Sequence, residues 1–400
     1  MVRFEEAIQL ILKHTPAPKS GVVSLSFSLG KVLAADIVAP YDSPPFDQSA
    51  MDGYALASSE IHKEENVSFQ LTDSIQAGKT LLHKIKKGET ARIFTGAALP
   101  KGTDTVVVQE QSSVNGTEVT FPSHLLTPWK NVRRKGSHVS KGEKVMVAGD
   151  LMTSGAIAFL ASIGISKVSV YLPPVLHLVV TGDELQSPGE KLKPGHIYES
   201  NSIALKAAFE ALGVFKEVKV YRVNDSLKRI AKRAATSLEN ADVVIFTGGV
   251  SVGDYDFVVP ALESVGVKPG FHKVKQKPGK PVFFGYKGRK LVFALPGNPA
   301  SVLTCFYTLV IPALSKLCRR NFVDFATLPS LNTFHCKPGM TQILKAFVDH
   351  TGVQILAHQE SYKLDAFVDA NALVILDENQ SEIQPGMPMN VLLFPTLRGL

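Results

Sequence analysis

The chain has 400 residues, 45% of them hydrophobic and 20% charged, which is the composition of a globular protein with about two to four domains. No apolar run reaches the roughly 18 residues that a membrane span needs. The longest one, at residues 302–314, is interrupted by Thr304, Thr308 and Pro312. A secretory signal begins with basic residues, whereas this N-terminus carries Glu5 and Glu6. We therefore expect a cytoplasmic protein that does not enter a membrane.

The cysteines and the charge narrow the chemistry further. Cys305, Cys318 and Cys336 have neither the spacing of a zinc site nor the even count of a disulfide framework, so we interpret them as reduced, packed residues, although one could be a catalytic thiol. The net charge of +7 is modest, but residues 264–323 are rich in Lys and Arg and contain no Asp or Glu. Such a segment could be a solvated basic face or a site for a phosphate or oxyanion. Because no aromatics are interleaved with it, we expect no nucleic acid partner.

The N-terminal part predicts a helical unit with a β-rich insertion. Residues 4–14 carry apolar side chains at helical spacing, and residues 28–39 show a second short helical pattern. The prolines of residues 42–48 predict a rigid turn. Short β-rich pieces separated by glycines, prolines and polar turns then predict a small, mostly antiparallel domain at residues 46–139. Residues 140–172 return to helical and mixed character, so we interpret residues 1–45 and 140–172 as one N-terminal helical and linking domain.

Strands and helices alternate over residues 173–318, which predicts a parallel, doubly wound α/β sheet with right-handed crossovers. One helix covers residues 201–213, with Asn201 as its N-cap and Gly213 just past its end. A second, amphipathic helix follows Asp225, which could cap it. Residues 319–400 have β character, and we expect a C-terminal β domain there.

Polar residues follow four of the predicted strands. Parallel α/β sheets bind ligands outside the carboxyl ends of their strands, so these loops should open on one rim. They contribute Thr181, Gly182, Asp183 and Glu184; Asp225; Gly248, Gly249, Ser251, Gly253, Asp254 and Asp256; and Pro296, Gly297, Asn298 and Pro299. Taken singly, each loop could be a solvated turn or a helix cap. Four converging loops favour a binding site.

The residue types at this rim suit a phosphorylated ligand. Glycines let backbone N–H groups approach a phosphate, and a helix start at residues 296–301 can hold an anion. Carboxylates beside a phosphate usually hold Mg²⁺. Lys273 and Lys277 supply positive charge nearby. The sequence therefore predicts a nucleotide or phosphorylated-cofactor site, although it contains neither a P-loop nor a GxGxxG motif.

Six motifs in order give the chain a specific resemblance. They are PPFDQSAMDGYA (44–55), TGAALPKGTDTVVVQE (95–110), TGDEL (181–185), TGGVSVGDYDF (247–257), KPGKP (277–281) and LPGNPAS (295–301). With them, nearly the whole chain resembles the molybdopterin molybdenumtransferases, the molybdenum insertase family of MoeA and the gephyrin E domain.

The resemblance implies an activity and an assembly. The family inserts molybdate into adenylylated molybdopterin with Mg²⁺ and releases AMP and the molybdenum cofactor. It implies a multidomain α/β protein with a parallel, doubly wound molybdopterin-binding domain, an inserted β-rich domain, an N-terminal helical unit and a C-terminal β domain. It also implies a homodimer whose site is completed by the opposite subunit. Molybdopterin adenylyltransferase and molybdoenzymes are further implied partners.

The resemblance also implies roles for single residues. Catalytic positions match Asp52, Glu184, Asp225 and Asp256, and we expect Glu184 and Asp256 to hold Mg²⁺. Cofactor-binding positions, including the glycine loop, fall on Thr95, Gly248, Gly249, Ser251, Lys273, Lys277, Pro296, Pro299 and Ser361.

Two departures from the family pattern stand out. Ser137 and His138 occupy the place of an expected carboxylate, which puts the role of that acid in doubt. Met340 stands where an arginine is common, and Lys345 could carry that charge instead. Two rival functions also remain: a nucleotide pyrophosphatase or amidohydrolase with the same α/β domain, and a scaffold or basic nucleic-acid binder. The first does not explain residues 44–55 or the inserted domain, and the acidic rim argues against pure scaffolding.

Overall fold

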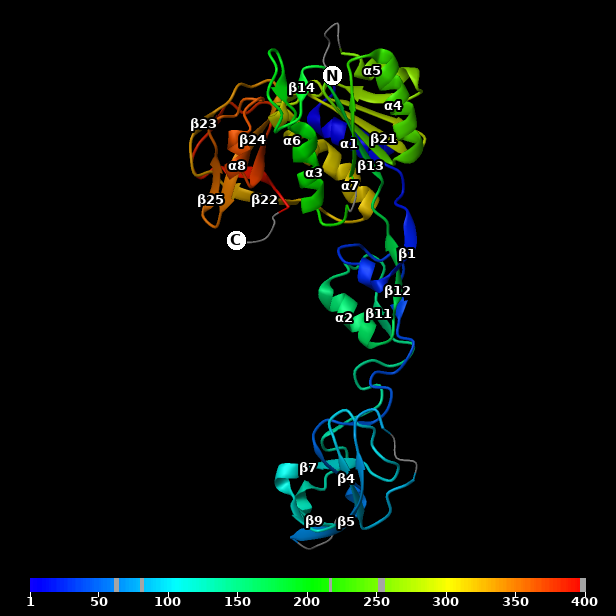
Figure 1. Cartoon of the computed structure of the whole chain (residues 1–400). Helices are drawn as coiled ribbons and strands as arrows, with labels where there is room; N and C mark the ends of the chain where they lie inside the picture. Colours follow the sequence, from blue (N-terminus) through cyan, green and yellow to red (C-terminus); the bar gives the residue numbers. More distant parts are fainter. Residues whose placement is uncertain (61–64, 80–82, 216–217, 251–255, 396–400) are drawn as a thin grey trace. The chain divides into compact units, whose positions relative to one another are not determined.

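The computed structural model describes residues 1–60, 65–79, 83–215, 218–250 and 256–395 (Figure 1). The chain forms two compact units. The first comprises Met1–Val23, Ser28–Ala34 and Ser169–Leu400, and the second comprises Ser24–Phe27 and Ala35–Val168.

A six-stranded sheet forms the centre of the first unit. In spatial order its strands are β16 (Val218–Val223), β13 (Leu176–Thr181), β17 (Val243–Thr247), β21 (Lys290–Leu295), β20 (Phe283–Lys287) and β18 (Lys268–His272). The first four strands run parallel, as predicted. β20 is antiparallel to both of its neighbours: it pairs with β18, and it forms a hairpin with β21 whose turn contains Gly288 at φ 57°. The run of parallel pairings thus ends at β21, and the edge strand β18 runs in the same direction as the first four strands.

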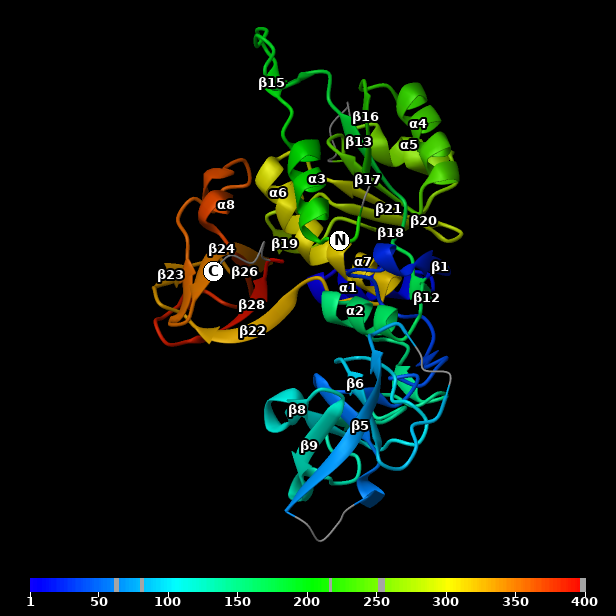
Figure 2. The same ribbon diagram turned by 60° about the horizontal axis from the view of Figure 1, so that its bottom comes forward.

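Helices cover both faces of this sheet (Figure 2). One face carries α1 (Phe4–His14), α3 (Asn201–Ala211), α6 (Pro299–Cys305) and α7 (Ile311–Cys318), and the other carries α4 (Leu227–Asn240) and α5 (Val258–Ser264). Successive strand residues point to opposite faces. Ile245 therefore packs with the first group of helices and Phe246 with the second. Every residue of β17 is buried, which explains why its sequence is an uninterrupted apolar run.

The apolar stretch after β21 forms one continuous helix, although Thr304, Thr308 and Pro312 interrupt its apolar sequence. A π-helical turn, η5 (Phe306–Val310), joins α6 to α7. The hydroxyls of Thr304 and Thr308 donate to carbonyls one turn earlier, so neither breaks the helix. Within the described part of the chain, this is the one helix long and apolar enough to cross a membrane, with a mean hydropathy of 1.5. In the structure 72% of the most apolar part of this helix, Pro299–Cys318, is buried inside the protein, as a core helix would be.

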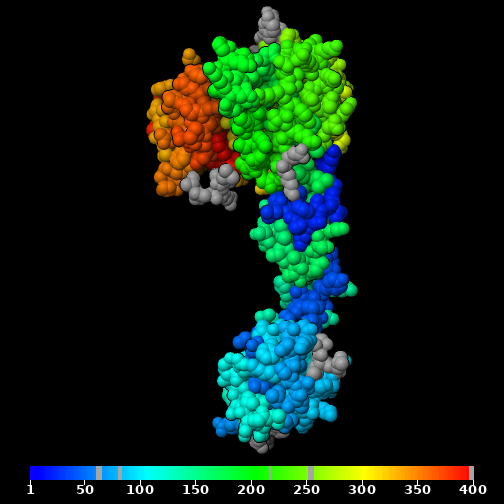
Figure 3. Space-filling model, viewed as in Figure 1, coloured from blue at the N-terminus to red at the C-terminus, as the bar shows by residue number. Residues whose placement is uncertain are grey.

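The C-terminal residues form the expected β domain, which packs on the α/β part of the same unit. Its sheet has the order β19 (Gln276–Lys277), β24 (Thr341–Asp349), β26 (Ala372–Leu376), β28 (Pro388–Leu393) and β22 (Asp324–Pro329), with β25 (Gly352–Ile355) on β24. Its smaller elements are β23 (Phe334–His335), β27 (Glu382–Ile383) and α8 (Asp365–Asp369). Ile343 and Leu392 share one apolar core with the α/β helices. In Figure 3 this orange and red region lies directly against the green α/β region.

The second unit contains the predicted β-rich insertion. Its six strands follow the order β7 (Thr105–Val108), β4 (Gly53–Leu56), β6 (Glu89–Ile93), β5 (Asn66–Ile75), β9 (Glu118–Pro122) and β8 (Ser113–Asn115). All pairs are antiparallel except β5 with β6. The unit also holds α2 (Ser154–Ser162), capped by the Thr153 hydroxyl.

Several short elements complete the chain. They are β1 (Ser20–Ser24), η1 (Leu25–Phe27), β2 (Ile37–Val38), β3 (Gln48–Ser49), η2 (Ser58–Glu60), η3 (Gln109–Gln111), η4 (Ser123–Leu125), β10 (Val132–Arg133), β11 (Lys144–Met146), β12 (Lys167–Tyr171), β14 (Leu185–Gln186) and β15 (Ile197–Tyr198). The helix predicted over residues 28–39 is absent from this described stretch. Gly30 takes a left-handed φ of 73°, and Leu33 forms a β-bridge with Val170. Long-range pairing has therefore overridden a short local helical pattern.

Candidate functional site at the sheet rim

Two glycines after β17 form the centre of the rim. Gly248 and Gly249 have φ values of 88° and 61°, which disfavour any residue with a side chain. A Cβ on Gly248 would lie 2.5 Å from the carbonyl oxygen of Thr181, and one on Gly249 would lie 2.9 Å from Val258. Only glycines fit here, so the loop that the sequence predicted as a phosphate cradle packs closely against Thr181 and Val258. Ser251, together with Gly253 and Asp254, lies outside the described residues.

The turn after β21 lies beside this glycine loop. The Gly248 amide donates to the carbonyl of Leu295 at 3.2 Å, and a Cβ on Gly297 would lie 3.9 Å from the Cα of Gly248. Pro296 is buried, and Pro299 is the first residue of α6. The two loops that the sequence assigned to one rim are therefore neighbours.

Asn201 holds this turn in a way that the sequence analysis missed. It was predicted as the N-cap of α3, but Ser200 is the N-cap and Asn201 is the first helical residue. The Asn201 side chain instead donates to the carbonyl of Gly297 at 2.8 Å. The sequence feature that could have indicated this contact is the position of Asn201 at the start of a helix after a loop. A polar side chain there can reach a neighbouring turn as well as its own helix.

Asp183 and Asp225 exchange hydrogen bonds across the rim. The Asp183 amide donates to Asp225 Oδ2 at 3.3 Å, and the Asp225 amide donates to Asp183 Oδ1 at 3.2 Å. Asn224 Nδ2 donates to the same Asp183 oxygen at 2.8 Å. The proposed helix cap was therefore wrong, since Ser226 is the N-cap of α4 and the Asp225 carboxylate is committed to the rim.

The acidic residues of the rim influence one another. The pKa of Asp225 is raised, chiefly by burial, and a hydrogen bond with Asp183 opposes this. The negative charges of Asp183, Glu184 and Asp256 raise it further. These carboxylates thus share one electrostatic environment, although their residues lie after three different strands.

The Glu184 carboxylate lies over a glycine. A Cβ on Gly182, whose φ is 142°, would lie 2.8 Å from Glu184 Oε2. The predicted Mg²⁺ ligands Glu184 and Asp256 have the hard oxygen atoms that this ion prefers, and a cation would relieve their repulsion. Among the described residues, no three His, Cys, Asp or Glu side chains form a group that could hold a metal ion. Two carboxylates, with water and phosphate oxygens, still suit Mg²⁺, so this ligand pair stays a prediction.

Lys277 and Ser361 line one cavity of about 490 Å³. Lys277 reaches it because β19 pairs with the start of β24, placing Lys277 opposite Gln342. Ser361 is fixed by Asn298, whose Nδ2 donates to the serine hydroxyl at 3.0 Å. The full lining is Lys277, Pro278, Phe334, His335, Cys336, Lys337, Gln342, Ile343, Leu344, Gln359, Glu360, Ser361 and Tyr362. The structure therefore brings together Lys277 and Ser361, two predicted site residues that lie 84 positions apart in the sequence.

Lys273 is the other basic residue of the predicted site. It is half-buried and adopts a left-handed φ of 71°, which is unusual for a residue with a side chain. Its amide donates to the carbonyl of Val282 at 2.9 Å, so its backbone is held in this conformation. It does not line the cavity with Lys277.

Asp52 and Thr95 form a pair within the second unit. The amide and the hydroxyl of Thr95 both donate to Asp52 Oδ1, at 2.8 Å and 2.7 Å. These two hydrogen bonds, backbone first, hold the pKa of Asp52 below its usual value, so it stays ionised. In the same unit His138 packs edge-on against Phe159, with ring centroids 5.7 Å apart. The residue at the position of the expected acid is thus engaged in an aromatic contact.

The fold and this rim define a multidomain protein with an α/β ligand-binding domain whose loops are rich in glycine and carboxylates. Family models cover most of the chain: residues 2–164 match the MoeA N-terminal region (domain I and II), residues 177–316 a probable molybdopterin binding domain, and residues 327–394 the MoeA C-terminal region (domain IV).

Individual relatives agree with the family models. The chain is 33% identical over 410 residues to a molybdopterin molybdenumtransferase of Haemophilus influenzae, with 100% of both chains covered. It is 32% identical to one of Staphylococcus epidermidis, covering 98% of this chain and 95% of that protein. A crystal structure of the molybdopterin biosynthesis MoeA protein from Pyrococcus horikosii matches with a TM-score of 0.83 and 30% identity, over 98% of this chain and 99% of that one. The chain belongs to the molybdopterin molybdenumtransferase family. The members of this family are transferases of molybdenum cofactor biosynthesis.

Proposed function

We propose that the protein inserts molybdate into adenylylated molybdopterin and releases AMP in a Mg²⁺-dependent step, giving the molybdenum cofactor. The observation that carries this proposal is the rim itself. The carboxylates that raise the pKa of Asp225 share the rim with Gly248 and Gly249, whose backbone conformation and packing only glycine allows. Carboxylates repel a phosphate unless a cation lies between the two. Their presence beside the glycine loop therefore favours a metal-assisted reaction at a phosphate.

Each part of the rim has a distinct role in this proposal. Glu184 and Asp256 would hold Mg²⁺, which when bound withdraws negative charge from a phosphate and can activate water. The Gly249 amide would bind phosphate oxygens, since the Gly248 amide already donates to Leu295. Lys277 and Ser361, which line the 490 Å³ cavity, would bind anionic groups of the cofactor and molybdate. Molybdate is a dianion and would be drawn to this positively charged part of the molecule.

We further propose that the working form is a homodimer. Asp52 and Thr95 match active-site positions of the family, yet they lie in the second unit of the chain. In a dimer, this pair would complete the rim of the opposite subunit. Molybdopterin adenylyltransferase would supply the adenylylated substrate, and molybdoenzymes would receive the product.

Asp256→Asn tests the proposed function. The protein is incubated with adenylylated molybdopterin, Mg²⁺ and molybdate, and AMP is measured. We expect the wild type to release AMP only with molybdate, and Asp256→Asn to release about 100-fold less while keeping its unfolding midpoint, since one metal ligand is lost. Glu263→Gln removes an exposed carboxylate of α5 and serves as the matched control. AMP release by Asp256→Asn at the wild-type rate would contradict the assignment.

The same assay separates the rival functions. Hydrolysis that does not depend on molybdate would support a pyrophosphatase. No AMP release, together with tight binding of a protein partner, would support a scaffold.

A further inference from the structure

A lysine is buried inside the C-terminal β domain. Lys345, in the middle of β24, is 2% exposed and is among the largest fully buried side chains of the described residues. We expected it to carry the charge of the arginine that Met340 replaces. Its ammonium group instead points into the protein. Burying a charge costs free energy unless hydrogen bonds compensate, so this residue requires an explanation.

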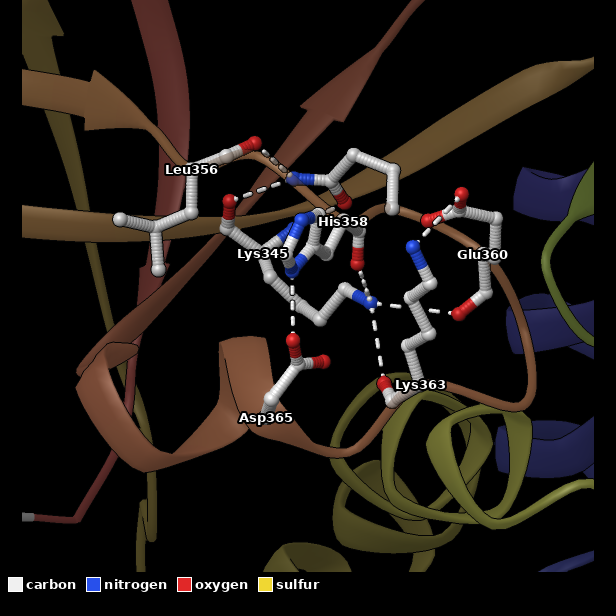
Figure 4. Close-up of polar contacts among 7 residues, drawn as sticks. Lys345, Leu356, His358, Glu360, Lys363 and Asp365 are labelled. Atoms are coloured by element: carbon white, nitrogen blue, oxygen red, sulfur yellow. Dashed lines mark hydrogen bonds and ion pairs between the residues drawn. The ribbon is translucent and has the colours of Figure 1, made fainter.

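One loop accepts the hydrogen bonds of the ammonium group. Lys345 Nζ donates to the carbonyl of His358 at 2.6 Å and to those of Glu360 and Lys363 at 3.4 Å each (Figure 4). A lysine has three N–H donors, and all three acceptors here are main-chain oxygens of residues 358–363. The Phe367 ring lies 5.7 Å from Nζ and adds a cation–π contact. The loop is thus folded around the ammonium group.

Further contacts fix the start of this loop to the same strand. The Gln359 side chain donates to the carbonyls of Lys345 and Leu356 and accepts from the Lys345 amide, all at 2.8–2.9 Å. His358 adopts a left-handed φ of 59°, and its Nδ1 lies 2.5 Å from an Asp365 oxygen. The ammonium group therefore holds the main chain of the loop, and the Gln359 side chain adds a second anchor to the same strand.

Ser361 lies in the middle of this loop. Its hydroxyl accepts the hydrogen bond from Asn298, and it lines the same cavity as Lys277 and Gln359. The path from Lys345 to the cavity therefore runs through the main chain of residues 358–363. Lys345 itself does not line the cavity.

We propose that Lys345 is a positioning residue: its ammonium group holds residues 358–363 in the conformation that presents Ser361 to Asn298 and to the cavity. It acts on the bound substrate only through this loop. The part of this inference that concerns activity rests on the proposed function, whereas the part that concerns the loop does not.

Kinetics of a double-mutant cycle test the coupling. Lys345→Met keeps the length of the side chain but leaves three carbonyls without their donor. We expect Lys345→Met and Ser361→Ala each to raise the KM for adenylylated molybdopterin about 10-fold, and the double variant to be no worse than the more impaired single one. A KM raised about 100-fold in the double variant, the product of two 10-fold effects, would overturn the proposal, because the two residues would then act independently.

Hydrogen exchange tests the loop without any activity. In Lys345→Met we expect the amides of residues 358–363 to exchange about 10-fold faster or more, with a smaller change elsewhere in the domain. Asn371→Ala is the matched control. Its side chain bonds both the amide and the carbonyl of Val348, so its loss weakens the domain away from the loop. We expect the control to lower the unfolding midpoint and leave the KM unchanged.

The outcomes separate this inference from the proposed function. If the wild type releases no AMP, the proposed function fails, and hydrogen exchange alone decides whether Lys345 holds the loop. If the wild type is active and Lys345→Met changes neither the exchange of residues 358–363 nor the KM, the inference is wrong. Should Lys345→Met not fold, Lys345→Gln retains two N–H donors and carries the same comparisons, with smaller expected changes.

Discussion

Asn298 Nδ2 donates a 3.0 Å hydrogen bond to the hydroxyl of Ser361. It joins the turn after the last parallel strand to a loop of the C-terminal β domain, 63 residues further along the chain. The pairing of β19 with β24 makes a second link between the same two parts. The cavity at Lys277 is therefore built jointly by the α/β domain and the C-terminal domain.

Asn298→Ala should impair the activity through Ser361. Without the amide the serine hydroxyl loses its partner on the turn, and we expect kcat/KM for AMP release to fall about 10-fold, the effect of one lost hydrogen bond. In Asn298→Asp the carboxylate can accept a hydrogen bond from the Ser361 hydroxyl and keep the contact, but its negative charge repels an anionic substrate. That variant should lose affinity more strongly at low salt than at high salt. Asn240→Ala, which removes an exposed bond at the end of α4, is the control and should match the wild type.

The two basic residues should respond differently to substitution. Lys273 has a left-handed backbone, so Lys273→Gly removes a charge without adding strain, and we expect an unchanged or slightly higher unfolding midpoint. Both Lys273→Gly and Lys277→Ala should weaken binding of adenylylated molybdopterin, and both should reduce the salt dependence of that binding. Titrations at two salt concentrations measure this. Lys268→Ala, on the exposed start of β18, should leave affinity and salt dependence unchanged; equal losses in all three variants would count against a specific site.

The parallel strands and their rim could be predicted because both depend on local pattern and topology. A strand buried on both faces must be an apolar run, as in β17, and parallel strands end at one edge. The loop at Gly248 and the turn at Pro296 were accordingly placed together. Lys277 and Ser361 were linked only through resemblance, because a two-residue strand such as β19 leaves no sequence period to detect.

Other features depend on long-range contacts that no local pattern contains. Asn201 and Asp225 both stand where caps are common, yet their side chains bind residues of other loops. Residues 28–39 do not form the predicted helix, since Gly30 takes a left-handed φ and Leu33 pairs with the distant Val170. Lys345 was expected only to replace the charge of an arginine, and a charged residue in a strand is usually exposed. Its partners lie 13 to 18 residues further on, and only the folded loop brings them together.

Gly248→Ala should destabilise the α/β domain. Its φ of 88° and the predicted 2.5 Å approach of a Cβ to the Thr181 carbonyl combine strain with a clash against backbone. We expect a loss of about 2–4 kcal/mol in the free energy of unfolding. Gly213→Ala is the matched control, with a φ of 72° but no described atom within 4 Å of an added Cβ. It should cost only about 1 kcal/mol. Chemical denaturation measures both, and equal losses would show that the clash with Thr181 is relieved by movement of the loop.

Asp225→Asn should make the protein more stable and less active. Burial and the charges of Asp183, Glu184 and Asp256 raise the pKa of Asp225 above its ordinary value of 3.8. A raised pKa means that the folded state binds this proton more tightly than the unfolded state does. The contribution of Asp225 to stability is therefore fully present below pH 3.8 and is lost as the pH rises through the folded pKa. At neutral pH the charge destabilises the fold, and its removal should raise the unfolding midpoint by roughly 1–2 °C while AMP release falls.

Asp242 provides a comparison of opposite sign. Burial raises its pKa, but hydrogen bonds from Lys19 and the Val175 amide, with the charges of Lys19 and Lys290, outweigh burial and leave the pKa lowered. Its stabilisation is thus present above pH 3.8 and is lost as the pH falls through the folded pKa. Asp242→Asn should lower the unfolding midpoint by about 2–4 °C at pH 7.

Thermal unfolding between pH 4 and pH 8 tests the Asp225 prediction. The higher unfolding midpoint of Asp225→Asn should come closer to that of the wild type as the pH falls. A gain that is constant across this range would mean that its cause is not the repulsion among the rim carboxylates.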